Sequence, residues 1–479
     1  MAFTTIPATG TIVPISRAKA PMASTWAVKP DSERDGLYPP TIKPPRAPLG
    51  FLKFVAAFIR NPLMVLPEAV YTEPIYRYGN MLTWVTDPQL IRKILLDDCE
   101  NFPKTPVERR VLSPLLGNGL LVSGGPEWRW QRQTSAPVFR QAEVLRYTPA
   151  MNAAADTIIA KWRKSPAGTI QPIDTDMSDA SYSVISDTML AGTDEPFDRA
   201  DLGNVRYSWP LAYALLGLPD WLWYPHRSRK EASERRMREA VLRLVQLRRA
   251  NLGKREDVLA LLLRAKEPES GRSMSDTELV DVLLTLLVAG HETTAKALAW
   301  TLYLIARSPQ WERRMLDEVH RVAGDAPIGR EHLDGLKVTS MVLKESMRVY
   351  SPVPTLTRIA REDTELGGTK VAAGSLIFIP IYAVHRHRRL WEDPDRFDPE
   401  RFAPERESGY SRYQYLPFGG GPRICIGSSF AMIESIVMLA AFVRAARFEV
   451  PAGFRPLPIS RVTLWSDGGM PLKVTMRSA

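Results

Sequence analysis

Apolar residues recur at helical spacing through most of the chain between about residue 50 and residue 350, and Gly and Pro residues break the pattern into segments. Apolar positions three and four residues apart lie on one face of an α-helix, so this spacing predicts a mainly helical protein. Short apolar stretches flanked by turn residues predict small β-sheets at about 79–85, at 352–380 and near the C-terminus at 462–474. The expected fold class is therefore mainly α with small β-sheets.

The clearest predicted helix runs from Asp276 to Arg307. Ser275 and Glu278 form a capping-box pattern at its start. The stretch 283–290 is apolar almost all round, so this helix is expected to cross the protein interior. A last helix is expected at about Ser428 to Arg447.

The N-terminal residues 1–48 are rich in Pro, Thr, Ser and Lys and predict an extended, partly disordered lead-in. The apolar stretch Phe51–Ile59 is too short to span a bilayer, and it predicts a first amphipathic helix packed on the core. Contact of this segment with a membrane surface is the alternative. No repeat or long linker follows, so residues 49–479 are expected to form a single domain.

The chain has 479 residues, of which 45% are hydrophobic and 24% are charged, which is ordinary for a globular protein. The formal charge of +10 points to an acidic partner or an anionic surface. Because the basic residues are dispersed, nucleic acid is not an expected partner. Two cysteines, Cys99 and Cys425, are too few for a disulfide scaffold, and no secretory signal pattern opens the chain, so a cytoplasmic location is expected.

The strongest chemical signal is the segment Phe418–Gly427, which reads Phe-Gly-Gly-Gly-Pro-Arg-Ile-Cys-Ile-Gly directly before the last helix. Three consecutive glycines allow a tight turn close to a flat cofactor. Cys425 precedes a helix N-terminus, whose dipole stabilises a thiolate. Gly427 omits a side chain where a large ring would clash. The alternative is a Gly-rich helix start that contains an ordinary cysteine.

This segment resembles the haem loop of the cytochrome P450 superfamily at every fixed position of the pattern Phe-x-x-Gly-x-Arg-x-Cys-x-Gly. The resemblance implies that Cys425 is the axial ligand of iron in haem b. It also implies that Phe418 packs beside the sulfur and that Arg423 pairs with a haem propionate. A thiolate ligand donates electron density that favours O–O cleavage.

Further segments agree with the resemblance in the same order along the chain. Glu345 and Arg348 match its Glu-x-x-Arg element and Arg401 its second arginine element, and these three imply a structural triad. Other residues at positions where the family contacts the propionates are Trp128, Arg132 and Arg358, with His385 left undecided. The alternative for the Trp128 segment is a basic surface helix.

The middle of the long helix reads Ala289-Gly290-His291-Glu292-Thr293-Thr294. Its small Ala-Gly pair and Thr293 are expected to loosen the helix locally. The matching family pattern binds dioxygen there, which gives Gly290 a cofactor-binding role and makes Glu292 and Thr293 an acid–alcohol pair that delivers protons. The alternative is a polar patch where the helix reaches the surface.

The resemblance implies the cytochrome P450 fold, with haem between the long central helix and the cysteine loop with its final helix. The implied reaction is NAD(P)H-linked insertion of one atom of O2 into a lipophilic small molecule. Because no flavin or iron–sulfur module is present in the chain, electrons are expected from a separate acidic ferredoxin served by a reductase. Four basic residues are expected to steer that ferredoxin: Arg129, Arg140, Arg444 and Arg447.

Two other function classes stay open on the sequence alone, a peroxide-driven enzyme or isomerase and a non-catalytic haem-binding sensor. The protein is expected to be a monomer without a transmembrane anchor. Three segments supply residues that could line the substrate pocket, with core packing as the alternative for each residue: Val111, Leu112, Leu115, Leu116 and Leu120; Leu286, Ala289 and Thr294; and Val353, Thr355 and Leu356. The segment Trp209–Pro225 resembles a substrate-access lid.

Overall fold

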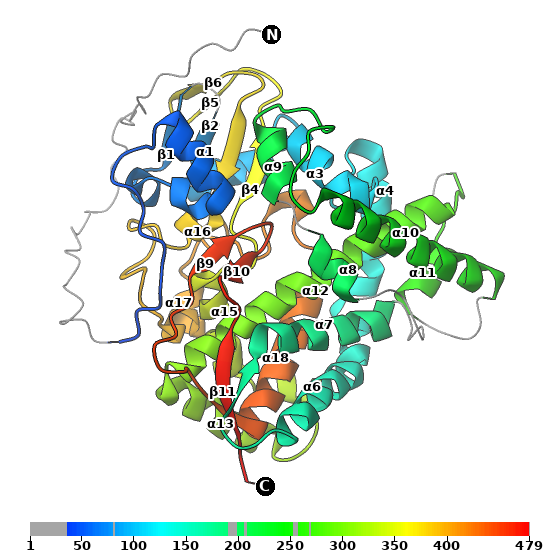
Figure 1. Cartoon of the computed structure of the whole chain (residues 1–479), viewed down its shortest axis with the longest axis vertical. Helices are drawn as coiled ribbons and strands as arrows, with labels where there is room; N and C mark the ends of the chain where they lie inside the picture. The colour runs from blue at the N-terminus through cyan, green and yellow to red at the C-terminus, as the bar shows by residue number, and fades with distance from the viewer. Residues whose placement is uncertain are drawn as a thin grey trace. The chain divides into compact units, whose positions relative to one another are not determined.

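The fold is described from a computed structural model, which defines residues 36–79, 82–189, 199–205, 208–251, 257–267 and 270–478 (Figure 1). Residues 1–35, most of the expected N-terminal lead-in, lie outside the described residues. The chain forms two compact units, each assembled from separate stretches. We call the described residues within Met1–Thr105, Met341–Cys425 and Ala452–Gly468 the cysteine unit, and those within Pro106–Ser340, Ile426–Pro451 and Gly469–Ala479 the helical unit.

The helical unit is built around α12 (Asp276–Ala306), against which α7 (Ile173–Met189) and α10 (Arg227–Ala250) pack. The expected capping box is confirmed, since the Glu278 backbone N–H donates to Ser275 Oγ and the Ser275 N–H donates to the Glu278 carboxylate. The other helices of this unit are α3 (Pro106–Leu116), α4 (Gly125–Ser135), α5 (Gln141–Val144), α6 (Thr148–Arg163), α8 (Arg199–Asn204), α9 (Ser208–Leu215), α11 (Val258–Arg264), α13 (Pro309–Ala323), α14 (Arg330–Leu333) and α18 (Ser428–Ala445), with 3-10 turns at Ala136–Phe139 and Leu145–Tyr147.

A three-stranded antiparallel sheet completes the helical unit in the order β3-β11-β8. Its strands are β3 (Thr169–Pro172), β8 (Ala446–Glu449) and β11 (Pro471–Met476). Because α18 ends at Ala445, Arg447 lies on β8 and not at the end of the final helix as the sequence predicted. On β11, Lys473 stands opposite Glu449 of β8, and their side chains form an ion pair of 3.2 Å.

The cysteine unit contains a four-stranded sheet in the order β1-β2-β7-β4. Strand β2 pairs with β7 in parallel, so residues 82–84 lie beside residues 376–378. The strands of this unit are β1 (Ile75–Tyr78), β2 (Leu82–Val85), β4 (Leu356–Ile359), β5 (Thr364–Leu366), β6 (Thr369–Val371), β7 (Leu376–Ile379), β9 (Pro458–Ser460) and β10 (Leu464–Ser466). Its short helices are α1 (Phe51–Arg60), α2 (Pro88–Arg92), α16 (Ile381–Val384) and α17 (Pro404–Glu407), and α15 (Lys337–Val349) enters it from the helical unit. Short 3-10 turns lie at Pro62–Val65, Glu68–Tyr71, Pro399–Phe402 and Gly421–Arg423, and a π-helical turn lies at Lys93–Asp97.

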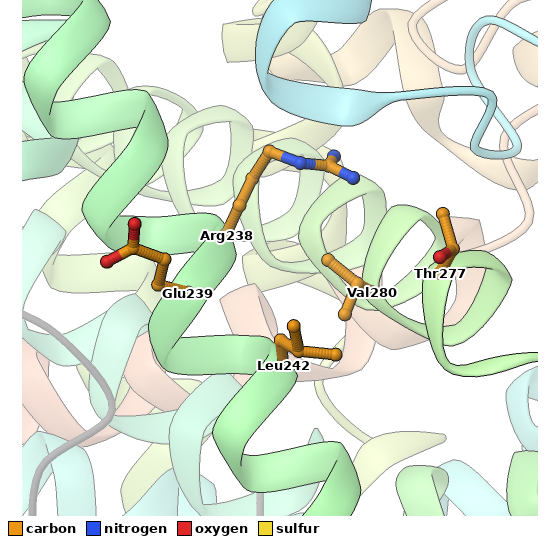
Figure 2. Close-up of a pocket in the computed structure, with 5 residues that line it drawn as sticks. All are labelled: Arg238, Glu239, Leu242, Thr277 and Val280. Carbon is orange, nitrogen blue, oxygen red and sulfur yellow. The ribbon is translucent and has the colours of Figure 1, made fainter.

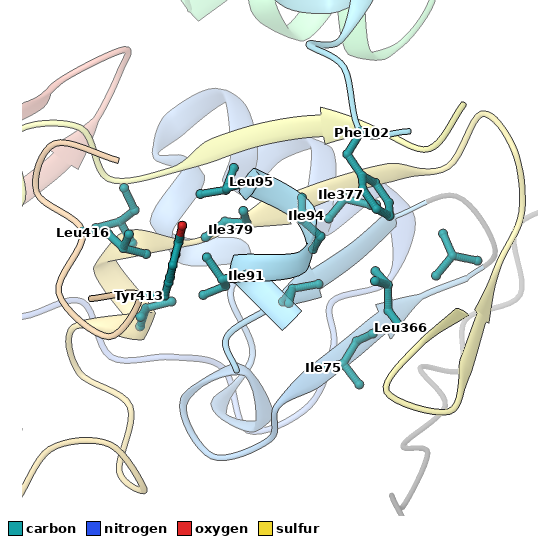
Figure 3. Packing of buried hydrophobic residues seen from close by; sticks show 14 of the residues in the cluster. Ile75, Ile91, Ile94, Leu95, Phe102, Leu366, Ile377, Ile379, Tyr413 and Leu416 are labelled. Carbon is teal, nitrogen blue, oxygen red and sulfur yellow. The ribbon is translucent and has the colours of Figure 1, made fainter. Parts of the chain in front are cut away.

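The core of the cysteine unit joins its sheet to the π-helical turn and to the segment that precedes the Gly-rich loop (Figure 3). Ile377 and Ile379 of β7 are fully buried, as is Ile94 of the turn. Tyr413 and Leu416, which come shortly before the loop, pack into the same cluster. The loop that carries Cys425 therefore starts from a well-packed base.

Helix α1 forms where the sequence predicts it, but it is not packed on the core as expected. None of its residues is buried. Phe54 stacks on Tyr78 of β1 with ring centroids 4.9 Å apart, while Leu52 is 82% exposed. The helix therefore lies on the surface of the cysteine unit, with its apolar side only half covered.

Among the described residues one helix, α18, is long and apolar enough to cross a membrane. Of its 18-residue span, 67% is buried inside the protein, which is also the character of a core helix.

Candidate active site

The Gly-rich loop is held by a backbone bond across it and by close contact with the π-helical turn. The N–H of Cys425 donates to the carbonyl of Phe418 over 2.9 Å. Gly421 has a φ of +69°, and a Cβ there would lie 1.7 Å from the carbonyl oxygen of Leu95. This position accepts only glycine, since both the backbone angle and the space forbid a side chain. The loop presents Cys425, which is exposed and in no disulfide, three residues before α18.

Gly427 differs from Gly421 because nothing in the chain requires glycine there. Its φ is −90°, and a Cβ would meet only Phe139 at an ordinary contact distance of 3.8 Å. The protein's own packing therefore does not account for the glycine. This is the behaviour expected if the position borders a group that is not part of the polypeptide.

His385 anchors the segment before the loop and uses both ring nitrogens to do so. Its Nδ1 lies 2.8 Å from the hydroxyl of Ser351, and its Nε2 accepts from the backbone N–H of Leu416 over 2.7 Å. Burial, together with the charges of Arg348 and Arg386, holds the pKa of His385 well below its usual value, so the ring is neutral. The sequence left His385 undecided as a propionate contact; the structure gives it a supporting role within the chain.

The predicted triad is present and buried. Arg348 donates to both carboxylate oxygens of Glu345, over 2.7 and 2.8 Å, and both side chains are fully buried. The Arg401 guanidinium lies 3.5 Å from the same carboxylate. Arg348 also donates to the carbonyls of His385, Pro394 and Arg396. The triad thus fixes the long coil that leads to the loop.

The other predicted site residues of the cysteine unit lie on the loop or on the adjacent strand. Phe418 and Arg423 are half-buried in the loop itself. Strand β4 contacts the loop, because a Cβ at Gly419 would lie 3.6 Å from Leu356. Arg358, on the same strand, is buried, and its Nη1 donates to the carbonyl of Thr357 over 2.7 Å.

Trp128 and Arg132 lie one turn apart on α4, and both are half-buried. Gln131, buried between them, donates to the carbonyl of Asn118 over 2.9 Å and accepts from Ser123 over 3.1 Å. This fixes the rotation of α4 about its axis. An i, i+4 pair shares one helix face, so the indole and the guanidinium point to the same side.

The centre of α12 is a continuous helix, so the local loosening predicted from the sequence is not observed. Thr293 Oγ1 donates to the Ala289 carbonyl over 2.7 Å, as Thr285 and Thr301 do toward their own i−4 carbonyls. Thr285 and Thr301 are buried, whereas Ala289 is exposed and Thr293 half-buried. Thr293 therefore differs from Thr285 and Thr301 because its hydroxyl, and the Ala289 residue whose carbonyl accepts from it, are accessible.

Gly290 has a packing reason that the sequence did not reveal. A Cβ at this position would lie 2.4 Å from Cδ1 of Ile185 on α7. The glycine thus permits close contact of α7 and α12, and its predicted role beside a cofactor stays a prediction. Next to it, the Nε2 of His291 lies 3.2 Å from the Ser178 hydroxyl of α7.

Sequence reasoning missed two charged residues of α12. Lys296, one turn after Glu292, is buried within the helical unit. Asp281 accepts from Arg238 of α10 over 2.8 Å and from the backbone N–H of Asn118 over 2.8 Å. Arg238 and Asn118 both lie far from Asp281 in the sequence. The only sign of these contacts in the sequence is an ionisable residue within an apolar helical stretch. No cluster of three or more His, Cys, Asp or Glu side chains that would hold a metal ion occurs among the described residues.

A cavity of about 130 Å³ lies between α10 and α12, and Figure 2 shows the residues that line it. One of them, Arg238, forms an ion pair with Asp281 of α12. The cavity is lined by Arg238, Glu239, Leu242, Thr277 and Val280. This volume is below the ~300–1,000 Å³ usual for small-molecule sites, and no predicted site residue lines it. Of the apolar residues expected near the substrate, Leu115 and Leu116 are fully buried core residues of α3.

Comparison with known proteins agrees with this arrangement. The family model for Cytochrome P450 matches residues 70–469. A cyclooctat-9-en-7-ol 5-monooxygenase of Streptomyces melanosporofaciens is 32% identical over 379 residues, covering 78% of this chain and 80% of that protein. A pentalenene oxygenase of Streptomyces avermitilis is 28% identical, covering 82% and 87%.

The fold has solved counterparts as well. The haem domain of cytochrome P450DA superposes with a TM-score of 0.80 at 25% identity, covering 92% of this chain and 99% of that one. The predicted fold class is confirmed. The chain belongs to the cytochrome P450 family and is a monooxygenase whose cofactor is haem b.

Proposed function

We propose that this enzyme inserts one atom of O2 into a lipophilic, terpenoid-type small molecule, with electrons from NAD(P)H delivered by a separate protein. The observation that carries the proposal is Cys425, an accessible thiol on a loop whose glycine, Gly421, is fixed by contact with Leu95. The family relationship gives that thiol its partner, haem iron.

The residues present fit haem b. Cys425 supplies one thiolate ligand, and haem bound there supplies oxygen activation, for which a thiolate ligand is suited. Gly427 leaves room beside the ligand that the chain's own packing does not need. We propose that the haem propionates are bound by Arg423, Arg358, Arg132 and the indole of Trp128, because planar multi-donor groups suit carboxylates. We also propose that Phe418 packs beside the sulfur of Cys425 and that Gly290 lies beside the cofactor.

In the proposed reaction the residues of α12 handle protons. Thr293 holds its hydroxyl proton against the Ala289 carbonyl, and this hydroxyl would be the group that gives up a proton during the reaction. Glu292, half-buried and adjacent in sequence, is the group that restores that proton. A positioned acid–alcohol pair of this kind supports general acid catalysis.

The substrate class rests on the relatives, whose names specify cyclooctat-9-en-7-ol and pentalenene as the molecules they oxidise. For the electron donor we propose an acidic ferredoxin, supported by the charge of +10 and by exposed Arg129 and Arg140. Arg444 is a weaker docking residue than the sequence suggested, because it donates to the carbonyls of Gly324 and Ala326. We also propose that residues 49–479 work as one catalytic domain in a cytoplasmic monomer.

The first experiment tests the ligand. The purified protein should contain one haem per chain, and its reduced carbon monoxide complex should show the red-shifted Soret band of thiolate ligation. Cys425→His and Cys425→Ala should lose that band. Persistence of the band in either variant would show that another residue ligates the iron.

The second experiment tests the reaction and the substrate. Cyclooctat-9-en-7-ol and pentalenene are titrated as probes for a low-to-high-spin shift. Products are then compared with NADPH plus surrogate ferredoxin and reductase, and with hydrogen peroxide alone. NADPH-dependent hydroxylation is the expected result. Product with peroxide alone would instead identify a peroxide-driven enzyme, and spin shifts without any product would identify a binding protein.

A further inference from the structure

A lysine is buried in the middle of the helix that carries the proposed proton-delivering pair. Lys296 is 5% exposed and is flanked on α12 by the fully buried Ala295 and Leu298. Lysines are almost never buried to this extent unless they are paired with an opposite charge. A helix that only had to pack against its neighbours would carry an apolar residue here.

Two carboxylates compensate the charge of Lys296. Burial lowers the pKa of its ammonium, while the charges of Glu292 and Asp174 raise it. Glu292 stands four residues earlier on α12, which places both side chains on one face of the helix. Asp174 belongs to the first turn of α7, the helix that packs along α12.

Asp174 is itself fixed in place. One of its carboxylate oxygens accepts from the backbone N–H of Met470 over 3.0 Å, just before β11 begins. Asp174 and Glu292 are both half-buried, whereas Lys296 is buried. Lys296 therefore interacts electrostatically with a carboxylate of each helix, and one of these carboxylates, Glu292, is the residue next to Thr293.

We propose that Lys296 is a positioning residue for monooxygenation, which orients the Glu292 side chain along α12, and that Asp174 holds Lys296 in turn. This inference rests on the proposed function of Glu292 and Thr293. Without the ammonium, the Glu292 carboxylate loses the charge that fixes its conformation. Proton delivery to Thr293 then becomes slower than the loss of reduced oxygen as hydrogen peroxide.

The helical unit supplies a matched control. Lys230 and Glu234 form another buried lysine–glutamate pair at i, i+4, with a distance of 2.6 Å between Nζ and Oε1. This pair lies on α10, and neither residue takes part in the proposed proton delivery. Lys230→Met therefore also removes a buried ammonium from a glutamate one helical turn away, at a place that should not affect coupling.

The test measures product and hydrogen peroxide per NADPH in haem-loaded enzyme, with whichever of pentalenene or cyclooctat-9-en-7-ol gives a spin shift. Lys296→Met should lower product per NADPH at least threefold and raise peroxide, with the spin shift retained. Combined with Glu292→Gln it should add little, because both variants remove the same function. Unchanged coupling, an additive loss, or an equal loss in Lys230→Met would overturn the inference.

Two further measurements keep the outcome decisive. If Lys296→Met yields too little haem-loaded protein, Asp174→Asn, at a half-buried site, should show a smaller loss of coupling in the same direction; no loss would overturn the inference. Independently of turnover, the Lys296 ε-carbon signal is followed by NMR in lysine-labelled ferrous carbon monoxide enzyme. Glu292→Gln should lower the pKa of that lysine, and an unchanged titration would contradict the contact.

The proposed function can fail separately from this inference. If Thr293→Ala and Glu292→Gln leave coupling unchanged, the acid–alcohol pair itself is wrong. If both lower coupling while Lys296→Met does not, the pair stands and the role of Lys296 is refuted.

Discussion

The imidazole Nε2 of His385 accepts a hydrogen bond from the backbone N–H of Leu416, 2.7 Å away, and the carbonyl of His385 accepts from Arg348. One buried residue therefore connects the Glu345–Arg348 ion pair to the segment that leads into the cysteine loop. Replacing His385 with Leu removes the acceptor and leaves the buried Leu416 N–H unsatisfied, which costs about 1–3 kcal/mol. We expect a lower Tm and weaker haem retention, with normal Soret position in the haem that remains. His385→Leu protein as stable as the wild type would contradict this support role.

Acid should destabilise the folded protein through two histidines. Burial holds the pKa of His385 well below 6.5 and lowers that of His387 to about 4. Because the unfolded chain takes up these protons near pH 6.5 and the folded protein does not, stability is intact above that pH. It then falls as the pH drops toward 4, by up to about 1.4 kcal/mol per pH unit for each histidine.

Urea midpoints of the haem-loaded protein at pH 7, 6 and 5 measure this loss. His387→Gln should make the decline with falling pH shallower, since one of the two titrating groups is removed. Midpoints that do not change between pH 7 and pH 5 would show that the two rings are protonated equally in both states.

Arg348→Ala should prevent folding of the protein and not merely slow its reaction. The substitution leaves Glu345 charged, buried and without its bidentate partner, a loss of roughly 3–5 kcal/mol. It also removes the donor for the carbonyls of His385, Pro394 and Arg396. We expect little soluble, haem-loaded protein, as judged by the ratio of Soret to protein absorbance. Arg348→Lys should not restore the yield of haem-loaded protein, because an ammonium cannot replace the planar guanidinium with its two donors to Glu345. A haem-replete Arg348→Ala enzyme that turns over slowly would argue for a direct catalytic role.

Two glycines of the cysteine loop should respond differently to alanine. At Gly421 a Cβ would clash with the Leu95 carbonyl at a φ of +69°, so Gly421→Ala should unfold the loop and lower the Tm by several degrees. At Gly427 the chain tolerates a Cβ, so the haem-free protein should keep its stability to within about 1 kcal/mol. Gly427→Ala should instead weaken haem binding, measured by haem transfer to apomyoglobin. Equal haem affinity in Gly427→Ala and wild type would remove the argument that a ring lies against this position.

Turnover at limiting ferredoxin should fall as salt rises from about 0.05 to 0.5 M, since the Debye length shrinks about threefold. Arg129→Glu and Arg140→Glu should raise the apparent ferredoxin requirement without changing substrate-induced spin shifts, because rim charges act mainly on association. Arg447→Glu, on β8 beside Glu449, serves as the control and should have a smaller effect. Insensitivity to salt and to both reversals would place the docking face elsewhere.

Local spacing in the sequence predicted the features that depend on neighbouring residues. The capping box of Ser275 and Glu278 and the Glu345–Arg348 pair are three residues apart, so helix geometry alone brings each pair together. The family resemblance added Arg401 to the second pair, and the structure bears this out.

Contacts between distant segments were not predictable in this way. Nothing near Gly290 in the sequence indicates Ile185, so the sequence predicts only a local loosening of the helix and a cofactor contact at this glycine. The partners of His385, Ser351 and Leu416, lie more than thirty residues away on either side. One of the two charges that compensate Lys296, that of Asp174, belongs to another helix, and the sequence does not indicate that contact. The contacts of Gly290, His385 and Lys296 all depend on tertiary packing, which the periodicity of the sequence does not reveal.

The division of each unit among separate stretches has a consequence for biosynthesis. Strand β2 pairs in parallel with β7. The ribosome synthesises residues 106–340 after β2 and before β7. Residues 36–105 must therefore leave the ribosome and wait, with their apolar faces uncovered, until the chain has grown past residue 379. Long-range parallel pairing of this kind is intrinsically slow and exposes aggregation-prone surface in the meantime. Since the stretch Met341–Cys425 follows Pro106–Ser340 along the chain, the loop of Cys425 is made only after that part of the helical unit. The ligand thus becomes available for haem insertion late, after most of the helical unit has been synthesised.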